Sequence, residues 1–346
     1  MRFINPDFSI PVNYFVQLEA TDDELSALMH YLGFLVTEHV YDKVTRDGRF
    51  APSSVWKWWA SGTFVGFSGN RVVLKSGHRF MDSYEPIGYL ATQSSHHSFL
   101  GYIKTCYAKI RQVRGAGSLA HHIAAFTARY PNFRQAKQHE LLLEKHGFVY
   151  LRMLELYNLT ETGKDVSSVV EVGGGACVNA AVMIGAFGCK YTIVDLPETI
   201  SVGFSFLKTI FPELRIALPN IIHEHIAGGG DFGSLLEEYD VVFMLPYQSD
   251  LIGDSAMDMA FNVSSFQEMN IKVVNEYLSL LHRVLKPGGS LVLENLKISR
   301  EIKGNSFENY RLDGFTEMKM CKPAYANFVI KKLSQLEHFF YQGVKG

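Results

Sequence analysis

A strand followed by three glycines and a helix is the feature that most restricts how this chain can fold. The run Val169–Val172 consists of β-branched valines except for Glu171, and Gly173, Gly174 and Gly175 follow it directly. Glycine permits a tight turn and lets a ligand approach the backbone, because no Cβ stands in the way. The N–H groups at the start of the next helix then point toward that ligand. The segment therefore predicts a βα unit whose turn binds a small molecule.

The second half of the chain repeats this alternation of short apolar runs and amphipathic stretches, which is typical of a parallel sheet with crossover helices. Strands are predicted at Ser168–Val172, Tyr191–Val194, Asp240–Leu245, Met257–Asn262 and Ser290–Asn295, and helices at Thr199–Ile210 and Gln267–Leu285. The segment Pro212–Glu238 is longer than an ordinary βα connection, and we interpret it as an insertion or a lid. The fold class is therefore α/β, a Rossmann-like, doubly wound and mostly parallel sheet.

The first 165 residues lack the βα alternation of the second half. With 346 residues, two domains are expected. Apolar residues recur at helical spacing in Asp22–Val44 and His139–Tyr157, while Thr63–Phe67 and Arg71–Leu74 indicate a hairpin. We predict a mainly helical module, residues 1–165, that recognises the substrate or forms a homo-oligomer. A ligand-binding domain, residues 166–346, follows it.

The overall composition excludes several classes of protein. The formal net charge of −2 shows no basic excess, so no nucleic-acid partner is expected. No run of about 18 apolar residues occurs, and no membrane span is expected. The first residues do not form a signal peptide, and the four cysteines are scattered without a C-x-x-C pair. These features favour a cytoplasmic protein with reduced thiols.

Two acids and one missing glycine narrow the choice of ligand. A dinucleotide fingerprint, G-x-G-x-x-G, needs a third glycine where this chain has Val178. Asp195 ends the next strand, at the place where an acid binds ribose hydroxyls. Glu171, just before the turn, would repel a pyrophosphate but suits the cationic methionine part of S-adenosylmethionine. An NAD-dependent oxidoreductase and a non-catalytic α/β protein remain the alternatives.

Two motifs resemble those of class I S-adenosylmethionine-dependent methyltransferases. E-V-G-G-G, from Glu171 to Gly175, resembles their E/D-x-G-x-G motif, and Arg283–Ser290 resembles their R-x-L-K-P-G-G turn. The resemblance implies S-adenosylmethionine as the cofactor. The residues expected to bind it are Glu171, Gly173, Gly174, Gly175, Asp195, Leu196, Tyr247, Gln248 and Asn262.

A second resemblance concerns the acceptor. The stretch D-L-P-E-T-I from Asp195, the Phe206–Pro212 stretch, and N-x-x-S-F-Q-E-M from Asn262 to Met269 resemble the bacterial sugar O-methyltransferase family of surface-polysaccharide biosynthesis. The resemblance implies methyl transfer to a hydroxyl of a sugar or nucleotide-sugar. Another small molecule, such as a phenol or an amine, is the alternative acceptor.

Polar side chains after the predicted fourth strand are suited to binding such an acceptor. Asn262, Ser264, Gln267 and Glu268 offer the donors and acceptors that sugar hydroxyls need. Ser265 and Glu268 also fit a capping box that would open the Gln267–Leu285 helix. Asn262 has no such local role, and we expect it to contact substrate or cofactor.

Methylation of a hydroxyl requires removal of its proton, so a base should lie near the acceptor. Glu268 and His139 are the candidate catalytic bases, with His96 and His97 as further histidines of the first module. A structural role is the alternative for each histidine. His223 and His225 do not complete a metal site, and no metal is predicted.

All three tryptophans lie close together in Val55–Trp59. An indole ring of this cluster could stack on the face of a sugar. Packing in the core or in an interface is the alternative interpretation of this cluster.

Overall fold

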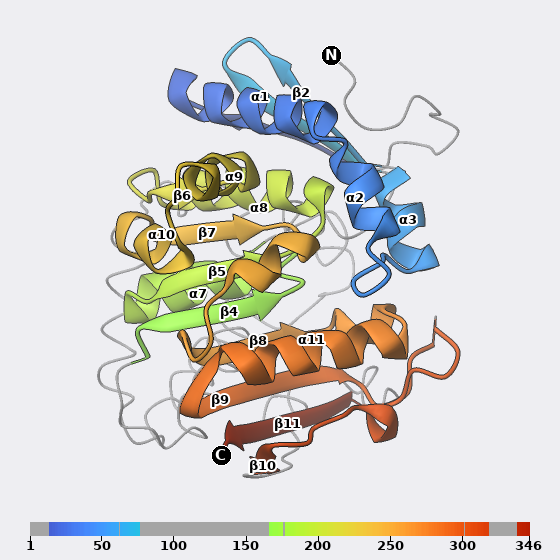
Figure 1. Cartoon of the computed structure of the whole chain (residues 1–346). Helices are drawn as coiled ribbons and strands as arrows, with labels where there is room; N and C mark the ends of the chain where they lie inside the picture. Colours follow the sequence, from blue (N-terminus) through green and yellow to red (C-terminus); the bar gives the residue numbers. More distant parts are fainter. Residues whose placement is uncertain (1–13, 62, 77–165, 176, 301, 318–337) are drawn as a thin grey trace, which may run out of the picture.

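The computed structural model describes residues 14–61, 63–76, 166–175, 177–300, 302–317 and 338–346. In this part of the chain an eight-stranded mixed sheet carries helices on both faces, and a three-stranded antiparallel sheet lies in the first half (Figure 1). The predicted α/β fold with a doubly wound, mostly parallel sheet is confirmed.

The large sheet has the strand order β10-β11-β9-β8-β4-β5-β7-β6, in which β11 is antiparallel to both of its neighbours. Its strands are β4 (Ser168–Val172), β5 (Lys190–Val194), β6 (Ile216–Ala217), β7 (Val241–Met244), β8 (Met257–Val263), β9 (Leu285–Leu296), β10 (Phe315–Glu317) and β11 (His338–Lys345). From β4 the chain passes to β5 and to the edge strand β6, places β7 between these two, and then returns to β8 on the other side of β4. This reversal makes the β4–β8 border the topological switch point, where ligands bind in open α/β sheets.

Both faces of the sheet are buried, because alternate residues of each strand point to opposite sides. Val169 and Tyr191 face a core shared with α7 (Val178–Phe187) and α8 (Pro197–Ile210). Val170 faces the second core, which contains side chains of the helices α9 (Pro219–Ala227), α10 (Phe232–Glu238) and α11 (Ile271–Val284). The remaining short helices are η3 (Pro246–Leu251), η4 (Phe266–Glu268) and η5 (Phe307–Asn309).

The described part of the first half packs on this domain. It consists of β1 (Tyr14–Glu19), α1 (Asp22–Thr37), α2 (Val40–Arg46), α3 (Ser54–Ser61), β2 (Thr63–Ser68) and β3 (Arg71–Ser76). The predicted hairpin is confirmed, since β2 pairs with β3 across a two-residue turn. Tyr31 of α1 donates a hydrogen bond to the Pro197 carbonyl at 3.0 Å, which joins α1 to the start of α8. The arrowheads of β4, β5 and β7 point toward the side where α2 and α3 lie (Figure 1).

Two predictions about the second half are wrong. The segment Pro212–Glu238 is not an insertion or lid, because it supplies the edge strand β6 and the helices α9 and α10 of the sheet. The second helix predicted from Gln267 begins at Ile271, after the separate turn η4. The helical character of residues 1–165 and the domain border at 165 stay predictions, because residues 77–165 lie outside the described part.

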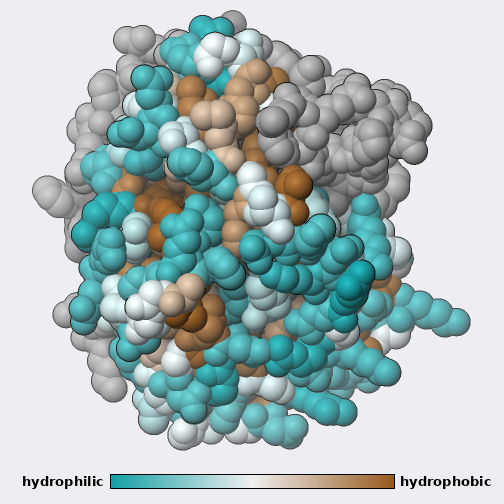
Figure 2. Space-filling model, turned by 45° about the horizontal axis from the view of Figure 1, so that its top comes forward, coloured by the Kyte–Doolittle hydropathy of each residue, from teal (hydrophilic) through white to brown (hydrophobic). Residues whose placement is uncertain are grey.

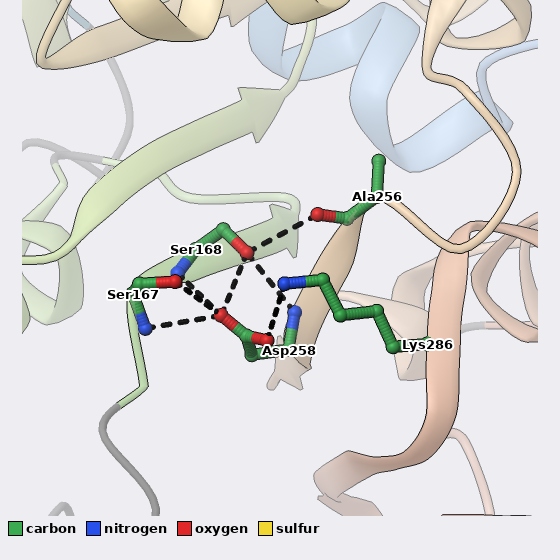
Figure 3. A network of polar contacts seen from close by, with 5 residues as sticks. All are labelled: Ser167, Ser168, Ala256, Asp258 and Lys286. Carbon is green, nitrogen blue, oxygen red and sulfur yellow. Dashed lines mark hydrogen bonds and ion pairs between the residues drawn. The ribbon is translucent and has the colours of Figure 1, made fainter.

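At the amino ends of the strands, a network of hydrogen bonds joins β4, β8 and β9 (Figure 3). One carboxylate oxygen of Asp258 accepts from the backbone N–H groups of Ser167 and Ser168 at 3.0 and 2.9 Å, and also from both serine hydroxyls. The other oxygen pairs with Lys286 Nζ at 2.6 Å. Burial opposes ionisation of Asp258, but the hydrogen bonds from Lys286 and the serines lower its pKa to about 2.

The surface of the described residues carries few exposed large apolar side chains. Figure 2 shows hydrophobic atoms in separate spots among hydrophilic ones on the face viewed there. The exposed large apolar residues are Met29, Val36, Leu251 and Ile298. Within the described ranges, none of the helices has both the length and the apolar character needed to cross a bilayer.

Candidate functional site

The glycine turn follows β4 and bends over the end of β5. Gly173 has a φ of 74° and donates its N–H to the Val194 carbonyl at 2.9 Å. Gly175 has a φ of 55° and donates its N–H to Oδ2 of Asp195 at 2.9 Å. Both φ angles lie in the left-handed region that favours glycine. The turn therefore brings two of the predicted cofactor-binding positions, Gly175 and Asp195, into direct contact.

The reason for glycine differs along the turn. A Cβ on Gly173 would lie 2.2 Å from the Ser265 hydroxyl oxygen, and one on Gly174 would lie 2.8 Å from a methyl carbon of Ile193. Glycine is thus needed at both positions because a Cβ would collide with neighbouring side chains of the protein. At Gly175 the space is open, so only there does the absence of a Cβ leave the backbone free for a ligand.

Asp195 is the buried acid of the site, with 6% of its surface exposed. Its Oδ1 accepts the Leu196 N–H at 2.7 Å, and its Oδ2 accepts the Gly175 N–H. Burial raises the pKa of Asp195 to about 7, although the hydrogen bonds from Leu196, Gly175 and Thr199 act in the opposite direction. The site thus holds a carboxylate that has N–H donors around it but no cation at hydrogen-bond distance among the described residues.

Glu171 is not among the residues that line the cavity described below, and its contact with the cofactor stays a prediction. It is 1% exposed, and its carboxylate accepts hydrogen bonds from Asn179 Nδ2 at 2.8 Å and from the Tyr191 hydroxyl at 2.9 Å. Asn179 belongs to α7 and Tyr191 to β5. The acid therefore fastens the end of β4 to its neighbours beneath the turn.

A small pocket, with a cavity volume of about 30 Å³, opens at the carboxyl ends of β4 and β5. Gly173, Asp195 and Leu196, which were predicted to bind the cofactor, line it. The other lining residues are Phe50, Ala51, Pro52, Ser53, Trp56, Val172, Val194, Pro246, Met269, Val273 and Tyr277. The cavity therefore combines one polar rim with largely apolar walls.

One of these walls comes from the first half of the chain, between α2 and α3. Phe50 is 3% exposed, and its ring centre lies 4.5 Å from that of Tyr277 on α11. The preceding residue, Arg49, forms a two-point ion pair with Asp250 of η3. Residues 50–53 and Trp56 thus close the cavity from the side opposite the glycine turn.

Asn262 is hydrogen-bonded to the residues that support the site, and its role as a substrate or cofactor contact stays a prediction. It is 0% exposed, and its Nδ2 donates to the Val172 carbonyl at 2.8 Å and to the Ser265 hydroxyl. Its Oδ1 accepts from the Phe266 N–H at 3.2 Å and from Asn295 Nδ2 at 2.9 Å. Both ends of the amide are therefore occupied by the protein itself.

The rest of the predicted acceptor element is tied to β9. Ser264 has a φ of 60°, and its N–H donates to the Glu294 carbonyl at 2.7 Å. The side chain of Gln267 accepts the Leu296 N–H at 2.8 Å, which makes its amide oxygen structural. Glu268 is half-buried and directly precedes Met269, which lines the cavity. Its role as a base stays a prediction.

The predicted capping box at Ser265 and Glu268 is wrong. Ser265 caps no helix with its side chain, because its hydroxyl donates to the Val172 carbonyl at 3.1 Å. The long helix begins only at Ile271. The Ser265 hydroxyl therefore bonds to the Val172 carbonyl of β4 instead of to a backbone N–H of its own turn.

Of the two predicted cofactor-binding residues Tyr247 and Gln248, Gln248 forms hydrogen bonds within the protein, and its contact with the cofactor stays a prediction. Its Oε1 accepts the Leu245 N–H and its Nε2 donates to the Pro219 carbonyl, both at 3.0 Å, so it joins η3 to α9. Tyr247 is half-buried, and burial raises its pKa to about 12. It lies next to the lining residue Pro246, and its cofactor contact stays a prediction.

His139, His96 and His97 lie outside the described residues. His223 and His225 lie on α9, not on a strand; His223 packs against Phe34, and His225 bonds to Ser234 at 2.8 Å. Among the residues that the structure describes, no group of three or more His, Cys, Asp or Glu side chains could hold a metal ion.

Little in the sequence indicates the apolar walls of the cavity. Trp56 belongs to the tryptophan cluster and was open to either interpretation, but nothing marked Phe50 or Pro52 as neighbours of the glycine turn. On α11, Val273 and Tyr277 have the four-residue spacing of any buried helix face. Their place in the cavity depends on how α11 packs beside β4, which the sequence spacing does not reveal.

Neither a protein-family model nor a curated protein matches the sequence. Among solved structures, the chain is similar to a SAM-dependent methyltransferase from Aquifex aeolicus, at 16% identity, with 55% of this chain and 89% of that chain covered and a TM-score of 0.32. It is also similar to the 1,6-didemethyltoxoflavin-N1-methyltransferase of Burkholderia thailandensis, at 15% identity, 65% and 88% coverage and a TM-score of 0.36. A third similar structure is the 4+2 cyclase SpnF, at 15% identity, 57% and 80% coverage and a TM-score of 0.37.

The strand order shows a doubly wound α/β fold, and TM-scores below 0.4 carry no argument about the enzyme class or the cofactor of this chain. Two of these similar proteins are named as methyltransferases. One of them is an N-methyltransferase and the third protein is a cyclase, so the likeness concerns the fold alone and leaves the acceptor open.

Proposed function

We propose that this protein is an S-adenosylmethionine-dependent O-methyltransferase whose acceptor is a hydroxyl of a sugar or nucleotide-sugar. The observation that carries the cofactor part is the cavity at the switch point of the sheet, where Gly173, Asp195 and Leu196 lie on one rim. When bound, the cofactor would supply the methyl group on a sulfonium.

Each wall of the cavity suits a different part of that cofactor. The ionised carboxylate of Asp195 accepts hydrogen bonds and so fits the two ribose hydroxyls. Leu196 and Pro246, together with aromatic rings of the opposite wall, offer the apolar surface that an adenine ring needs. None of the hydrogen-bond partners of Asp195 among the described residues is a cation that could neutralise a pyrophosphate. The site therefore suits a ligand without a pyrophosphate better than one that has it.

The acceptor part rests on the resemblance of the Asn262–Met269 element and on the aromatic wall. An indole such as that of Trp56 can stack on the apolar face of a sugar ring, while Phe50 and Tyr277 keep water away. Glu268 and His139 are the proposed bases for the hydroxyl proton. Asn262 and Gln267 also form hydrogen bonds within the protein, and their contact with the acceptor stays a prediction.

The first test is calorimetry with S-adenosylhomocysteine, S-adenosylmethionine and NADH. We expect micromolar binding of the two sulfur compounds, weakened at least tenfold by Asp195→Ala, because a buried charged hydrogen-bond partner is lost. Asp258→Ala, at the other end of the sheet, is the matched control and should leave the dissociation constant unchanged. Binding of NADH alone would replace the methyltransferase with the oxidoreductase alternative.

The second test concerns the acceptor. The chain is incubated with methyl-labelled cofactor and a panel of sugars, nucleotide-sugars, phenols and amines. We expect label on a sugar hydroxyl, and Glu268→Gln should slow the transfer if Glu268 is the base. Label found only on amines or phenols would replace the sugar assignment, and binding without any turnover would indicate a non-catalytic protein.

A further inference from the structure

Two side chains from the loop after β8 hold the residue from which the glycine turn starts. Asn262 Nδ2 donates to the Val172 carbonyl at 2.8 Å, and the Ser265 hydroxyl donates to the same oxygen at 3.1 Å. Val172 is the last residue of β4 and directly precedes Gly173. Its carbonyl therefore receives two donors at the point where the chain leaves the sheet.

The Asn262 amide is itself fixed by a relay of hydrogen bonds from β9. The Gln267 N–H donates to Asn295 Oδ1 at 3.2 Å, and Asn295 Nδ2 donates to Asn262 Oδ1 at 2.9 Å. Asn262 and Asn295 are both 0% exposed. Because each amide oxygen in this relay accepts from a nitrogen, the orientation of Asn262 is determined, and its Nδ2 is the end that points at Val172.

Ser265 also contacts the turn directly. A Cβ on Gly173 would lie only 2.2 Å from the Ser265 hydroxyl oxygen, so Ser265 leaves no room for a side chain at Gly173. On the other side, the Gly173 N–H donates to the Val194 carbonyl at 2.9 Å. Gly173 is thus held between β5 and the loop after β8, and its left-handed conformation is fixed from both neighbours.

We infer that Asn262 and Ser265 are positioning residues that act on the cofactor through Val172 and Gly173. They hold the turn so that the Gly175 N–H stays on Asp195 and the rim of the cavity keeps its shape. The inference rests on the proposed function, and it assigns the first half of the Asn262–Met269 element to the cofactor instead of the acceptor. Cofactor affinity should then depend on side chains that do not touch the cofactor.

The affinity test uses calorimetry with S-adenosylhomocysteine on Ser265→Ala, Asn262→Ala and the double variant. Each single change should weaken binding about tenfold, which is the loss of roughly one buried hydrogen bond. Because both side chains act on one carbonyl, the double variant should lose clearly less than the product of the two. Ser168→Ala is the matched control, since Ser168 is also a buried serine of a hydrogen-bond network but lies at the opposite end of β4.

A second measurement needs no cofactor. Amide hydrogen exchange in the free protein should become faster at Gly173 and Gly175 in Ser265→Ala, and stay unchanged at Val169 and Val170. Ser168→Ala should leave exchange at the two glycines as it is. If Asn262→Ala does not fold, Ser265→Ala alone carries both measurements.

The outcomes are distinct. Unchanged affinity and unchanged glycine exchange in Ser265→Ala would overturn the inference, as would losses that simply multiply in the double variant. If the wild-type chain binds no S-adenosylhomocysteine, the proposed function fails, and the exchange experiment still decides whether the two side chains position the turn.

Discussion

The two ends of the parallel strands each hold an aspartate that accepts backbone N–H groups, and the two aspartates differ in their charged neighbours. Asp258, at the amino ends, has Lys286 at 2.6 Å and two serine hydroxyls, and its pKa is lowered to about 2. Asp195, at the carboxyl ends, is more deeply buried beside two N–H donors, and its pKa is raised to about 7. The carboxylate of Asp258 is thus paired with a cation of the protein, whereas that of Asp195 has no cation at hydrogen-bond distance among the described residues.

This difference indicates what each end of the sheet does. A carboxylate with a cation and four hydrogen bonds has little capacity left, so Asp258 serves to join the strands. A carboxylate buried without a cation is costly for the folded protein, and such costs are concentrated at functional sites. Hydroxyl donors from a ligand would offset that cost at Asp195. The comparison therefore supports the carboxyl end as the binding end, and each prediction below tests it.

The largest effect is expected from Gly173→Val. The added side chain would collide with Ser265, and a β-branched residue is strained at a φ of 74°. We expect loss of S-adenosylhomocysteine binding by at least about 100-fold, measured by calorimetry. Gly289→Ala is the control at the amino end, where a Cβ would lie 2.8 Å from the Lys286 carbonyl. It should lower the melting temperature and leave binding intact; if it also abolished binding, the two ends would not be independent.

Asp195→Asn should reduce cofactor affinity about tenfold and remove its pH dependence. In the wild-type chain the folded pKa, about 7, lies above the ordinary value of 3.8. Ionisation of Asp195 therefore costs folding stability as the pH rises from about 4 to 7. The ionised form is also the better acceptor for hydroxyls, so affinity should increase through pH 7. Titrations between about pH 5.5 and 8.5 measure this, and an affinity that is flat with pH in the wild type would contradict it.

Asp258→Asn should change stability and not binding. Its folded pKa, about 2, lies below the ordinary value of 3.8, so its stabilising effect is fully present above about pH 4 and is lost as the pH falls toward 2. We expect a loss of about 2 kcal/mol in the free energy of unfolding at pH 7, from the charged hydrogen bonds removed. Urea unfolding at pH 7 and near pH 3 should show the difference from wild type shrinking in acid. A weaker binding of S-adenosylhomocysteine would break the separation of the two ends.

The smallest effect is expected from Arg49→Ala. Arg49 and Asp250 are about half exposed, so their ion pair should contribute only about 0.5 kcal/mol. Because the pair fixes the loop that begins at Phe50, we expect cofactor affinity to fall about twofold at low salt and to match the wild type near 0.5 M salt. Arg46→Ala removes a more exposed pair, with Asp42, and should leave affinity unchanged.

The sequence was a good guide wherever the structure depends on local pattern. The strand Ser168–Val172 has the predicted bounds, and the hairpin around Gly69 forms as the turn residues indicated. The glycine turn and Asp195 meet because the carboxyl ends of neighbouring parallel strands share one edge of the sheet, which the βαβ alternation implied. The contact between Gly175 and Asp195 at that edge was therefore predictable from the sequence.

Hydrogen bonds between residues far apart in the chain could not be predicted from the sequence. Ser265 fits a capping box by spacing, but the Val172 carbonyl, 93 residues earlier, takes its hydroxyl. Asn262 and Glu171 carry polar groups that suit a ligand, yet each is occupied by a partner from another strand or helix. Residue type alone does not distinguish a side chain that binds a ligand from one that holds the binding turn in place.

The wall formed by α3 has a spectroscopic consequence. All three tryptophans of the chain, Trp56, Trp58 and Trp59, lie on this one helix, and Trp56 lines the cavity. Intrinsic tryptophan emission therefore reports on the helix α3 instead of an average over the molecule. Ligand entry, or separation of the first half of the chain from the sheet, should be visible as a change in emission without any added label.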